Sequence, residues 1–433
     1  MRPAPALIWL LAGWALLGLL VSFALVPTLA WPLAGGLLAL LALVDALRLR
    51  RQPLPSVRRD LPEALAVGIE RAVELVLEAG ARRQRVDVFD LHPVGWEATG
   101  LPRRLDLAPG SDSRFAYRLR PVERGNADFI GVHLRLHAPW RLWWRRATVA
   151  PEQRVRVFPN FAPLAKLALL GDEQASRAVG AHVRRRRGEG TDFHQMRDYR
   201  IGDSLRQIDW KATARMRRLI SREYQDERNQ QLVLLVDTGQ RMLARDGNLS
   251  HFDQTLDAAL VVSWLALRQG DAVGLLAHGG PRRWVPPQRG AGAIDVLLRE
   301  TYDLQPQSVA TDYLAAATEL TLRQRRRSLV MLVTNLRDED SEDLLTAVRL
   351  LRQRHHVVIA SLREQVLDQA LDDDAHDLRG ALRATSAARY LQQRAVAHDA
   401  LRAHHVAVLD VTCAELPGAL VERYLAIKRE GLL

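Results

Sequence analysis

The chain opens with an almost continuous apolar segment. No charged residue occurs between Pro3 and Val44, and two prolines divide the run. Since one membrane-spanning helix needs about 20 apolar residues, we expect helices over about Ala4–Leu25 and Leu29–Leu47, joined by a tight turn. A signal peptide is the competing interpretation. Its apolar region usually spans about 7–15 residues, whereas here a second apolar segment follows at once.

From residue 56 to about residue 160, apolar positions alternate with polar ones. In RFAYRLR, Phe115, Tyr117 and Leu119 fall on one face and arginines on the other, and GVHLRLH repeats the pattern. A period of two predicts half-buried antiparallel strands, and turn-rich breaks such as APGSDS separate them. Several short strands at this spacing predict a β-sandwich-like domain over 56–160. We expect its arginines and histidines on the solvent face.

From residue 231 the pattern changes to α/β. The uncharged run LVLLV ends on Asp237, and its continuous apolar character predicts a strand buried on both faces. SLVMLVTNL and HVVIASL are similar runs, and stretches with helical spacing lie between them. This alternation predicts a doubly wound, largely parallel sheet with helices on both faces over 231–433. Function in such sheets sits at the carboxyl ends of the strands, which makes Asp237 a candidate site residue.

Charge adds a possible class of partner. The chain has 61 Lys and Arg against 50 Asp and Glu, a formal net charge of +11, and almost all of the excess is arginine. An anionic partner such as nucleic acid or lipid headgroups is one interpretation. Because the arginines are spread along the chain, we favour general arginine usage instead. WRLWWRR at 140–146 likewise fits a basic-aromatic patch or a strand edge with one buried tryptophan, and we favour the strand edge.

Arginines also flank both apolar helices and predict an orientation. Arg2 precedes the first helix, and the exit of the second is followed by Arg48, Arg50, Arg51, Arg58 and Arg59. By the positive-inside rule both ends of the hairpin lie in the cytoplasm. Everything after about residue 50 is then expected on the cytoplasmic side of the membrane.

Several familiar catalytic motifs are absent from the sequence. It contains no GxxxxGKS/T loop, no GxGxxG opening a helix, no HExxH and no GxSxG elbow. The single cysteine, Cys413, allows no disulfide framework and no cysteine-based zinc site, and we expect it to be buried and structural. Histidine pairs at 355–356 and 404–405 precede predicted strands. We expect them at helix C-termini, where a cation suits the dipole, with metal binding as the alternative.

A dense polar segment, Arg184–Arg228, precedes the α/β region and resembles the signature of the domain-of-unknown-function 58 family of bacterial proteins. The matching residues are Gly190, Phe193, Arg197, Tyr199, Gly202, Asp203, Arg206, Asp209, Trp210, Ala214, Arg215 and Glu227. The layout of the chain is similar as well. It has a transmembrane hairpin over 1–50, the β-rich domain over 56–160, a linker and signature over 161–230, and an α/β domain over 231–433 that resembles von Willebrand factor A.

This resemblance implies a membrane-anchored adaptor in the bacterial inner membrane, with its soluble domains facing the cytoplasm. No enzymatic activity is established for the family, and relatives are commonly encoded beside MoxR-type AAA+ ATPases. We therefore expect a non-enzymatic protein whose partner is such an ATPase, bound through strand-end loops with Arg241 and Arg337. The alternatives are an arginine-rich module for nucleic acid or anionic lipid, which lacks a recognised reading motif, and a hydrolase with an unrecognised site.

The resemblance also bears on metal binding. Von Willebrand factor A domains often bind Mg²⁺ through a DxSxS loop, a threonine and a further aspartate, all hard oxygen ligands. Asp237 and Thr311 match this set, but Gly239 and Arg241 replace the two serines. Asn335 stands where the further aspartate is expected. We expect this remnant to bind no cofactor, or Mg²⁺ only weakly, and the Arg241 guanidinium to pair with Asp237 in place of the cation.

The signature itself has three interpretations. We expect a turn at Gly202, a cap from Asp203 or Ser204, and a short helix from about Leu205. This helix would contain intrahelical pairs of Asp209 and an apolar anchor formed by Ile208 and Trp210. A charge-paired wedge docked on the α/β domain is the favoured role, and a partner-binding surface is the alternative. Catalysis is least favoured, because nearby arginines would hold these carboxylates ionised.

Overall fold

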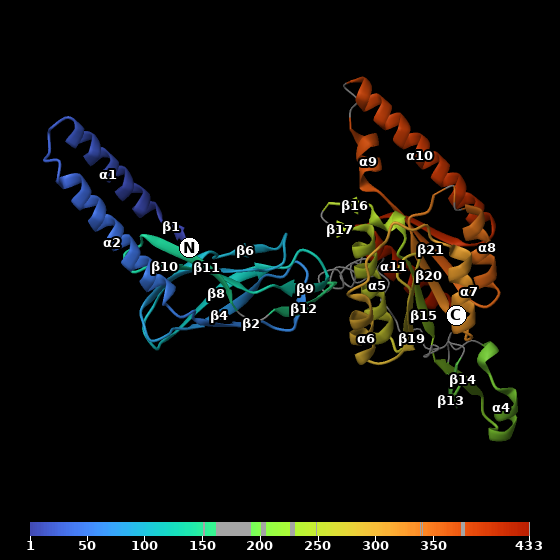
Figure 1. The fold of residues 1–433 in the computed structure, drawn as a ribbon. Coiled ribbons are helices and arrows are strands. Elements are labelled where there is room, and N and C mark those ends of the chain that lie inside the picture. The colour runs from blue at the N-terminus through green and yellow to red at the C-terminus, as the bar shows by residue number, and fades with distance from the viewer. Residues whose placement is uncertain are drawn as a thin grey trace. The chain divides into compact units, whose positions relative to one another are not determined.

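The computed structural model describes residues 1–149, 152–161, 192–200, 205–225, 230–247, 249–337, 339, 341–373 and 377–432. The chain forms two compact units, Met1–Phe158 and Pro159–Leu433 (Figure 1). The first unit combines the apolar helices with a β-rich domain. The second contains the signature segment and the α/β domain.

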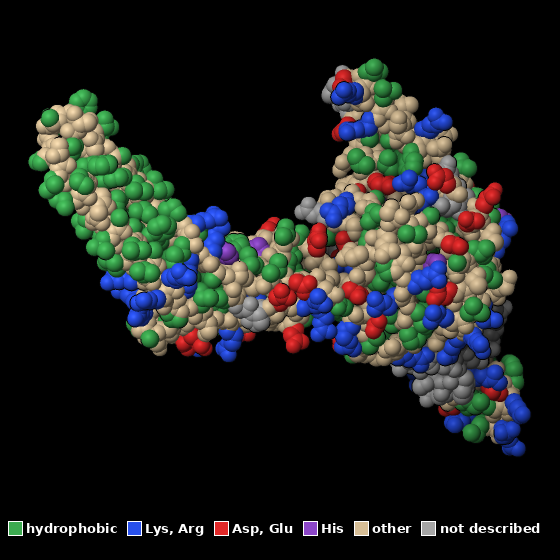
Figure 2. Space-filling view, in the orientation of Figure 1, with side chains coloured by type: hydrophobic (Ala, Val, Ile, Leu, Met, Phe, Trp, Pro, Cys, Tyr) green, Lys and Arg blue, Asp and Glu red, His purple; other side chains and the backbone are tan. Residues whose placement is uncertain are grey.

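The N-terminal hairpin consists of α1 (Pro5–Ser22) and α2 (Ala30–Arg50), both long and apolar enough to cross a membrane. Figure 2 shows their surface covered by apolar side chains. The Trp14 and Trp31 rings stack with centroids 4.8 Å apart. Gly35 makes room for this stack, because a Cβ there would lie 2.8 Å from the Trp14 indole nitrogen. The two predicted apolar helices are confirmed, and the second continues to Arg50.

Both ends of the hairpin bind one region of the β-rich domain. Before α1, strand β1 (Arg2–Pro3) pairs with β11 (Trp143–Val149). In α2, the fully buried Asp45 carboxylate accepts the backbone N–H groups of Trp140 and Leu142, each at 3.0 Å. WRLWWRR thus forms a turn and the start of a strand, and its buried side chain is Leu142 rather than a tryptophan.

The β-rich domain packs three sheets around one apolar core. Their strand orders are β1-β11-β10-β5-β7, β2-β4-β8-β6 and β3-β12-β9. Besides β1 and β11, the strands are β2 (Ser56–Asp60), β3 (Ala64–Ala66), β4 (Arg71–Glu78), β5 (Gln84–Asp90), β6 (Glu97–Thr99), β7 (Arg103–Leu107), β8 (Asp112–Arg120), β9 (Gly125–Phe129), β10 (Val132–His137) and β12 (Gln153–Phe158). The predicted alternation is confirmed in β8, where Tyr117 and Leu119 are buried between exposed arginines.

Arg59 contradicts the expectation that the arginines of this domain face solvent. Alternation along β2 turns Val57 and Arg59 to the same inner side. The Arg59 guanidinium pairs with the fully buried Asp90 at 2.5 Å, and the Tyr117 hydroxyl donates to Asp90 at 2.6 Å. Burial and the Asp90 charge raise the pKa of Tyr117. Arg59 is therefore a core residue and not one of the charges that flank the membrane helix.

The α/β domain is built on a six-stranded sheet of order β19-β18-β15-β20-β21-β22. All neighbours are parallel except the edge strand β19, which runs antiparallel to β18. The strands are β15 (Gln231–Asp237), β18 (Ala272–His278), β19 (Arg283–Gln288), β20 (Leu329–Thr334), β21 (His356–Arg363) and β22 (Ala407–Thr412). The continuous apolar runs are strands buried on both faces, as the sequence predicts.

Helices cover both faces of this sheet (Figure 1). One face carries α5 (His251–Arg268), α6 (Gly292–Thr301) and α11 (Leu416–Glu430). The other carries α7 (Tyr313–Arg323), α8 (Ser341–Arg352) and the C-terminal part of α10 (Leu378–Ala403). Shorter elements are η2 (Gln240–Leu243), β16 (Arg245–Asp246), β17 (Leu249–Ser250) and α9 (Gln365–Asp372). The result is a mixed α/β fold with a core on each side of the sheet.

Within the second unit, the signature segment forms a two-stranded hairpin with short helices between its strands. Strands β13 (Asp192–Asp198) and β14 (Ile220–Gln225) pair antiparallel. Between them lie η1 (Leu205–Gln207) and α4 (Trp210–Met216).

Candidate functional site

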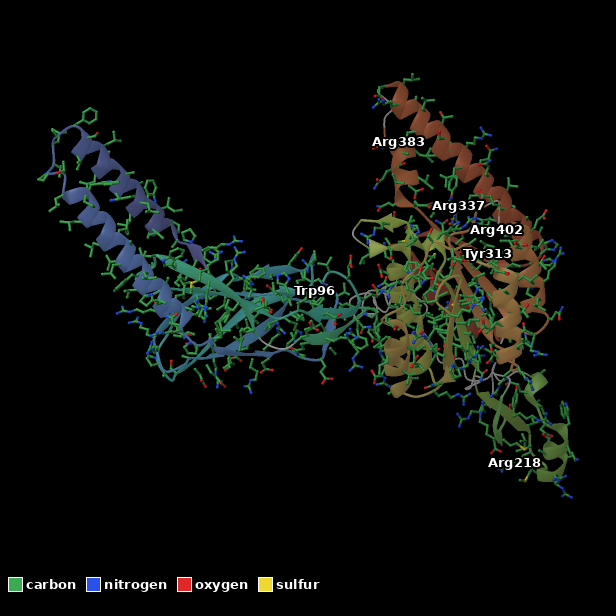
Figure 3. All side chains as sticks on the ribbon, viewed as in Figure 1. Trp96, Arg218, Tyr313, Arg337, Arg383 and Arg402 are labelled. Atoms are coloured by element: carbon green, nitrogen blue, oxygen red, sulfur yellow. The ribbon has the colours of Figure 1, made fainter. Side chains whose placement is uncertain are left out.

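Asp237 lies at the carboxyl end of β15, at the centre of the sheet, and its carboxylate is almost fully buried. Oδ1 accepts the Gly239 backbone N–H at 2.7 Å and the Thr311 hydroxyl at 2.5 Å. Oδ2 accepts the Thr334 hydroxyl at 2.7 Å and the Tyr313 hydroxyl at 3.3 Å. Figure 3 labels Tyr313 at this end of the sheet. One carboxylate thus ties together the end of β15, the end of β20 and the start of α7.

Close packing surrounds this carboxylate. A Cβ at Gly239 would lie 2.1 Å from the Thr311 hydroxyl and 2.8 Å from the Val309 carbonyl oxygen. A serine at this position would therefore displace the Thr311 loop. The structure brings two predicted residues, Asp237 and Thr311, into direct contact. A cation at Asp237 would have to replace hydrogen bonds that four protein donors already make.

Asn335, the third residue of the predicted remnant, belongs to another network. It follows β20 and is fully buried. Its side-chain amide donates to Glu364 at 2.8 Å and accepts from Arg394 at 3.1 Å. The side chain of Asn335 is thus hydrogen-bonded to Glu364 and Arg394, and its place in a degenerate metal-site remnant with Asp237 and Thr311 stays a prediction. The amide oxygen of Asn335 accepts from a buried guanidinium on α10, and a charged donor makes a stronger hydrogen bond than a neutral one.

Arg394 is a site residue that the sequence reasoning missed. Its guanidinium is buried and donates to Asp410 at 3.0 Å and to the Ser361 hydroxyl at 2.6 Å, besides Asn335 and two backbone carbonyls. It joins the carboxyl ends of β20, β21 and β22 to α10. The spacing in the sequence could have indicated this, because Arg394 falls on the same side of the helix as the other buried residues. The buried positions of α10 are Ala387, Arg394, Ala397, His398 and Leu401. The arginine thus occupies the apolar stripe of the helix.

Arg241 also differs from expectation. Its guanidinium donates to Glu339 at 3.3 Å. The hydrogen bonds to Asp237 come instead from Gly239, Thr311, Tyr313 and Thr334. The predicted pairing of Arg241 with Asp237 is wrong, because hydroxyl and backbone donors satisfy the carboxylate first. Arg337, the second predicted loop charge, is half-buried just after β20.

A groove of about 720 Å³ lies next to this strand end, along α7. Apolar side chains form part of its wall, with Leu314 40% and Leu322 71% exposed. His278 at the end of β18 lies on the groove, with Arg282 just after it. Burial, and then the Arg282 charge, lowers the pKa of His278. Because β18 and β15 pair in parallel with His278 opposite Asp237, the groove borders the Asp237 cluster.

In the signature segment, Asp209 organises the local structure. Its Oδ1 caps α4 by accepting the backbone N–H groups of Lys211 and Ala212, at 3.0 and 2.9 Å. Its Oδ2 accepts from Arg222 of β14 at 2.8 Å. The Ala212 N–H, and then Arg222, lowers the pKa of this carboxyl. Asp209 is thus the cap of the helix, and the expected intrahelical pairing is replaced by a pair with β14.

Trp210 does not form the predicted anchor. Its side chain is 67% exposed, whereas Ile208 is buried. Trp210 is the first residue of α4, directly after the cap Asp209. Arg197 donates to the Asp198 carbonyl, the Tyr199 N–H to the Leu219 carbonyl, and Arg215 is exposed. Gly202, Asp203, Glu227 and the side chain of Arg206 lie outside the described residues.

One further cluster contains ligand types suited to a metal. Asp246, His251 and Cys413 bring their side-chain donor atoms within 4.8 Å of one another. His251 Nε2 lies 3.2 Å from Asp246, so these two already share a hydrogen bond. Burial, and then the Asp246 charge, raises the pKa of the Cys413 thiol. The expected burial of Cys413 is confirmed. A protonated thiol there is a poor nucleophile and a poor metal ligand.

Comparison with known proteins identifies the family. Residues 195–398 match the model of the family described as "Protein of unknown function DUF58". This region of the chain is similar to the DUF58 family. The resemblance predicted from the signature is thereby confirmed, and the matched region extends from the signature through most of the α/β domain.

The relatives compared match only part of the chain. An uncharacterized protein of Mycobacterium tuberculosis H37Rv is 26% identical over 159 residues, which cover 36% of this chain and 50% of that protein. YeaD of Bacillus subtilis is 22% identical over 255 residues, 59% of this chain and 61% of YeaD. The chain therefore spans about half the length of the mycobacterial relative. A solved aerotolerance-related membrane protein from Bacteroides fragilis aligns with 14% identity and a TM-score of 0.29, over 46% of this chain and 99% of that one.

Proposed function

We propose that the protein is a non-enzymatic adaptor, anchored in the bacterial inner membrane, whose von Willebrand factor A-like domain binds a protein partner. In chain order the strands of the sheet run 3-2-1-4-5-6, the order of doubly wound nucleotide-binding folds. The first strand ends on Asp237, beside Thr311. Both features support a Rossmann-like domain of the von Willebrand class.

The groove along α7 carries the proposal that this domain binds protein. Leu314, Thr318 and Leu322 recur every four residues, so they follow one side of the helix. Exposed apolar side chains rimmed by charges, here Arg323 and Glu319, mark protein interaction sites. An amphipathic helix laid in such a groove would bury the leucines and meet the charged rim.

The chemistry of the neighbouring groups supports a role without catalysis. The Asp237 carboxylate accepts four hydrogen bonds, so it offers no free lone pair directed at a substrate. The Cys413 thiol has a raised pKa and is buried. A general base or nucleophile needs a perturbed group that is open to a cleft, and neither residue meets that requirement.

The hairpin supports the proposed orientation. Strand β1 and the end of α2 bind the same region of the β-rich domain, which supports a hairpin whose two ends lie on one side of the membrane. Arg2 and Arg48 lie next to these two ends. Positive charge beside short apolar helices favours the cytoplasmic side.

The family resemblance makes a MoxR-type AAA+ ATPase the proposed partner. The test is a pull-down of the purified ATPase by the full-length protein in nanodiscs, in each nucleotide state. Leu322→Glu should abolish capture, because it places a charge in the groove. Leu382→Glu is the matched control, since Leu382 is also an exposed helical leucine (58%) but lies on α10.

Three results would count against parts of this proposal. Failure of the wild-type protein to capture the ATPase at low salt, in every nucleotide state, would exclude the partner. Capture that Leu322→Glu leaves unchanged would keep the partner and exclude the groove. Turnover of a substrate by the purified protein would exclude the non-enzymatic role.

A further inference from the structure

The two histidine pairs of the sequence meet at one place in the fold. His355 and His356 lie at the amino end of β21, and His405 lies just before β22. These strands are parallel neighbours, with Val358 opposite Ala407, so their amino ends adjoin. These residues lie at the amino ends of the strands, whereas Asp237 and the α7 groove lie at the carboxyl ends.

The histidines line a pocket of about 230 Å³ that is rich in cations. Three arginines come from three other elements: Arg327 just before β20, Arg352 at the end of α8 and Arg423 on α11. The rest of the lining is a valine and an alanine, and it includes no carboxylate. Like charges repel when gathered in a partly enclosed space, so this arrangement requires either fixed acceptors or an anion.

Acceptors within the protein satisfy only some of the hydrogen-bond donors that line the pocket. Arg352 donates to the His404 carbonyl, and Arg327 donates to the Leu432 carbonyl at 3.0 Å. Within the described residues, the buried Arg423 Nε and His356 Nε2 have no partner with hydrogen-bond geometry. His355 is only 4% exposed. Buried polar atoms are normally paired, so the unpaired atoms of Arg423 and His356 point to a ligand.

We propose that this pocket binds the phosphate group of a small anionic ligand. A tetrahedral oxyanion accepts hydrogen bonds on several sides at once, and guanidinium forks match its geometry. The volume suits a phosphate or pyrophosphate rather than a drug-sized molecule, for which pockets of about 300–1,000 Å³ are usual. A metal ion is disfavoured, because three guanidinium groups would repel it. The proposal does not depend on the partner proposed for the α7 groove.

The experiment is isothermal titration of the full-length protein in detergent with inorganic phosphate, pyrophosphate and ATP, at low ionic strength. We expect saturable one-site binding of at least one of them. Arg423→Gln should weaken that binding at least ten-fold. Arg429→Gln is the matched control, because it removes the same charge from an exposed position on the same helix, and it should bind like the wild type.

The ligands separate the sources of the phosphate group. ATP that binds as tightly as pyrophosphate would indicate a nucleotide, whereas binding of phosphate or pyrophosphate alone would indicate a free inorganic anion. If Arg423→Gln does not fold, His356→Gln provides the same comparison. Absence of saturable heat with all three ligands would overturn the proposal, as would wild-type affinity in the folded pocket variant. Binding only to an oligonucleotide would also overturn it.

Discussion

Thr311 donates its hydroxyl hydrogen to Oδ1 of Asp237 at 2.5 Å, across 74 positions of sequence. In the von Willebrand factor A pattern that the sequence resembles, both residues would be oxygen ligands of one Mg²⁺ ion. Here they bind each other, and Tyr313 and Thr334 occupy the second carboxylate oxygen. These hydrogen bonds therefore hold the loops around Asp237 together.

We expect Mg²⁺ to bind Asp237 weakly or not at all. The ion would have to break four existing hydrogen bonds, and Gly239 supplies no side-chain oxygen. Calorimetry with MgCl2 on the full-length protein measures this directly. A dissociation constant in the low micromolar range, lost in Asp237→Ala, would show that a functional metal site is present.

Arg394→Leu should lower the free energy of unfolding by about 3 kcal/mol, because it removes the buried guanidinium that donates to Asp410 and to the side-chain oxygen of Asn335. Arg402→Leu on the same helix is the control (Figure 3). Its ion pair with Asp399 is exposed, so the loss should stay below about 1 kcal/mol. Urea denaturation of both variants gives the comparison. Equal midpoints would mean that Arg394 does not hold the strand ends together.

Asp209→Ala should loosen the signature segment, whereas Trp210→Ala should leave its stability nearly unchanged. The carboxylate caps α4 and binds Arg222, but the indole is mainly in solvent. Hydrogen exchange at the amide of Ile220 reports on the fold of this segment. Fast exchange at the Ile220 amide in Trp210→Ala would show that the tryptophan does anchor the segment.

The pH dependence of the same segment follows from the lowered pKa of Asp209. A carboxyl whose folded pKa is depressed stabilises the fold above its unfolded pKa. That stability is lost as the pH falls through the folded pKa. We expect protection to be constant near neutral pH and to decline only in acid, below the ordinary aspartate value of 3.8. Asp209→Asn keeps a capping side chain and should remove this acid dependence.

Cys413 should react slowly with thiol reagents in the folded protein. Burial and the Asp246 charge raise its pKa, so the reactive thiolate is scarce at pH 8. We expect labelling by a disulfide reagent to be much slower in buffer than in urea. Asp246→Asn should speed the native reaction by removing the neighbouring charge. Rapid labelling of the wild-type protein in buffer would contradict the raised pKa.

A reporter fused to the C-terminus tests the orientation. With both ends of the hairpin in the cytoplasm, a fluorescent protein should mature there, and a phosphatase that requires the periplasm should stay inactive. Reversing the charges of Arg48, Arg50 and Arg51 to glutamate should weaken this preference. An active periplasmic phosphatase on the wild-type chain would overturn the proposed topology.

Periodicity predicted the strands well because burial on one or both faces leaves a direct record in the sequence. The run that ends on Asp237 and the alternation around Tyr117 are examples. A strand end can also be located this way, so Asp237 and Asn335 were both placed at the edge of the sheet. What periodicity does not encode is the direction in which an end residue turns. Asn335 turned to Arg394, a partner on a helix far along the chain.

The remaining errors have a similar origin. Trp210 was expected inside because tryptophan is usually buried, but a helix of one or two turns exposes whichever face its cap selects. The convergence of His356 and His405 depends on β21 and β22 being neighbours. Strand order is a non-local property, so the two histidine pairs could not be brought together from their spacing alone. Arg59 differs for another reason, because its position in the alternation along β2 places it inside and Asp90 neutralises its charge there.

The pairing of β1 with β11 imposes an order of assembly. Arg2 and Pro3 are synthesised before the apolar helices, whereas their partners Trp143 and Trp144 follow only after most of the β-rich domain. The apolar helices emerge in between, so they meet the membrane while the N-terminal strand has nothing to pair with. Closing a contact of such long range is slow. The step that completes this sheet therefore also fixes the start of the hairpin to the β-rich domain, after the apolar helices have formed.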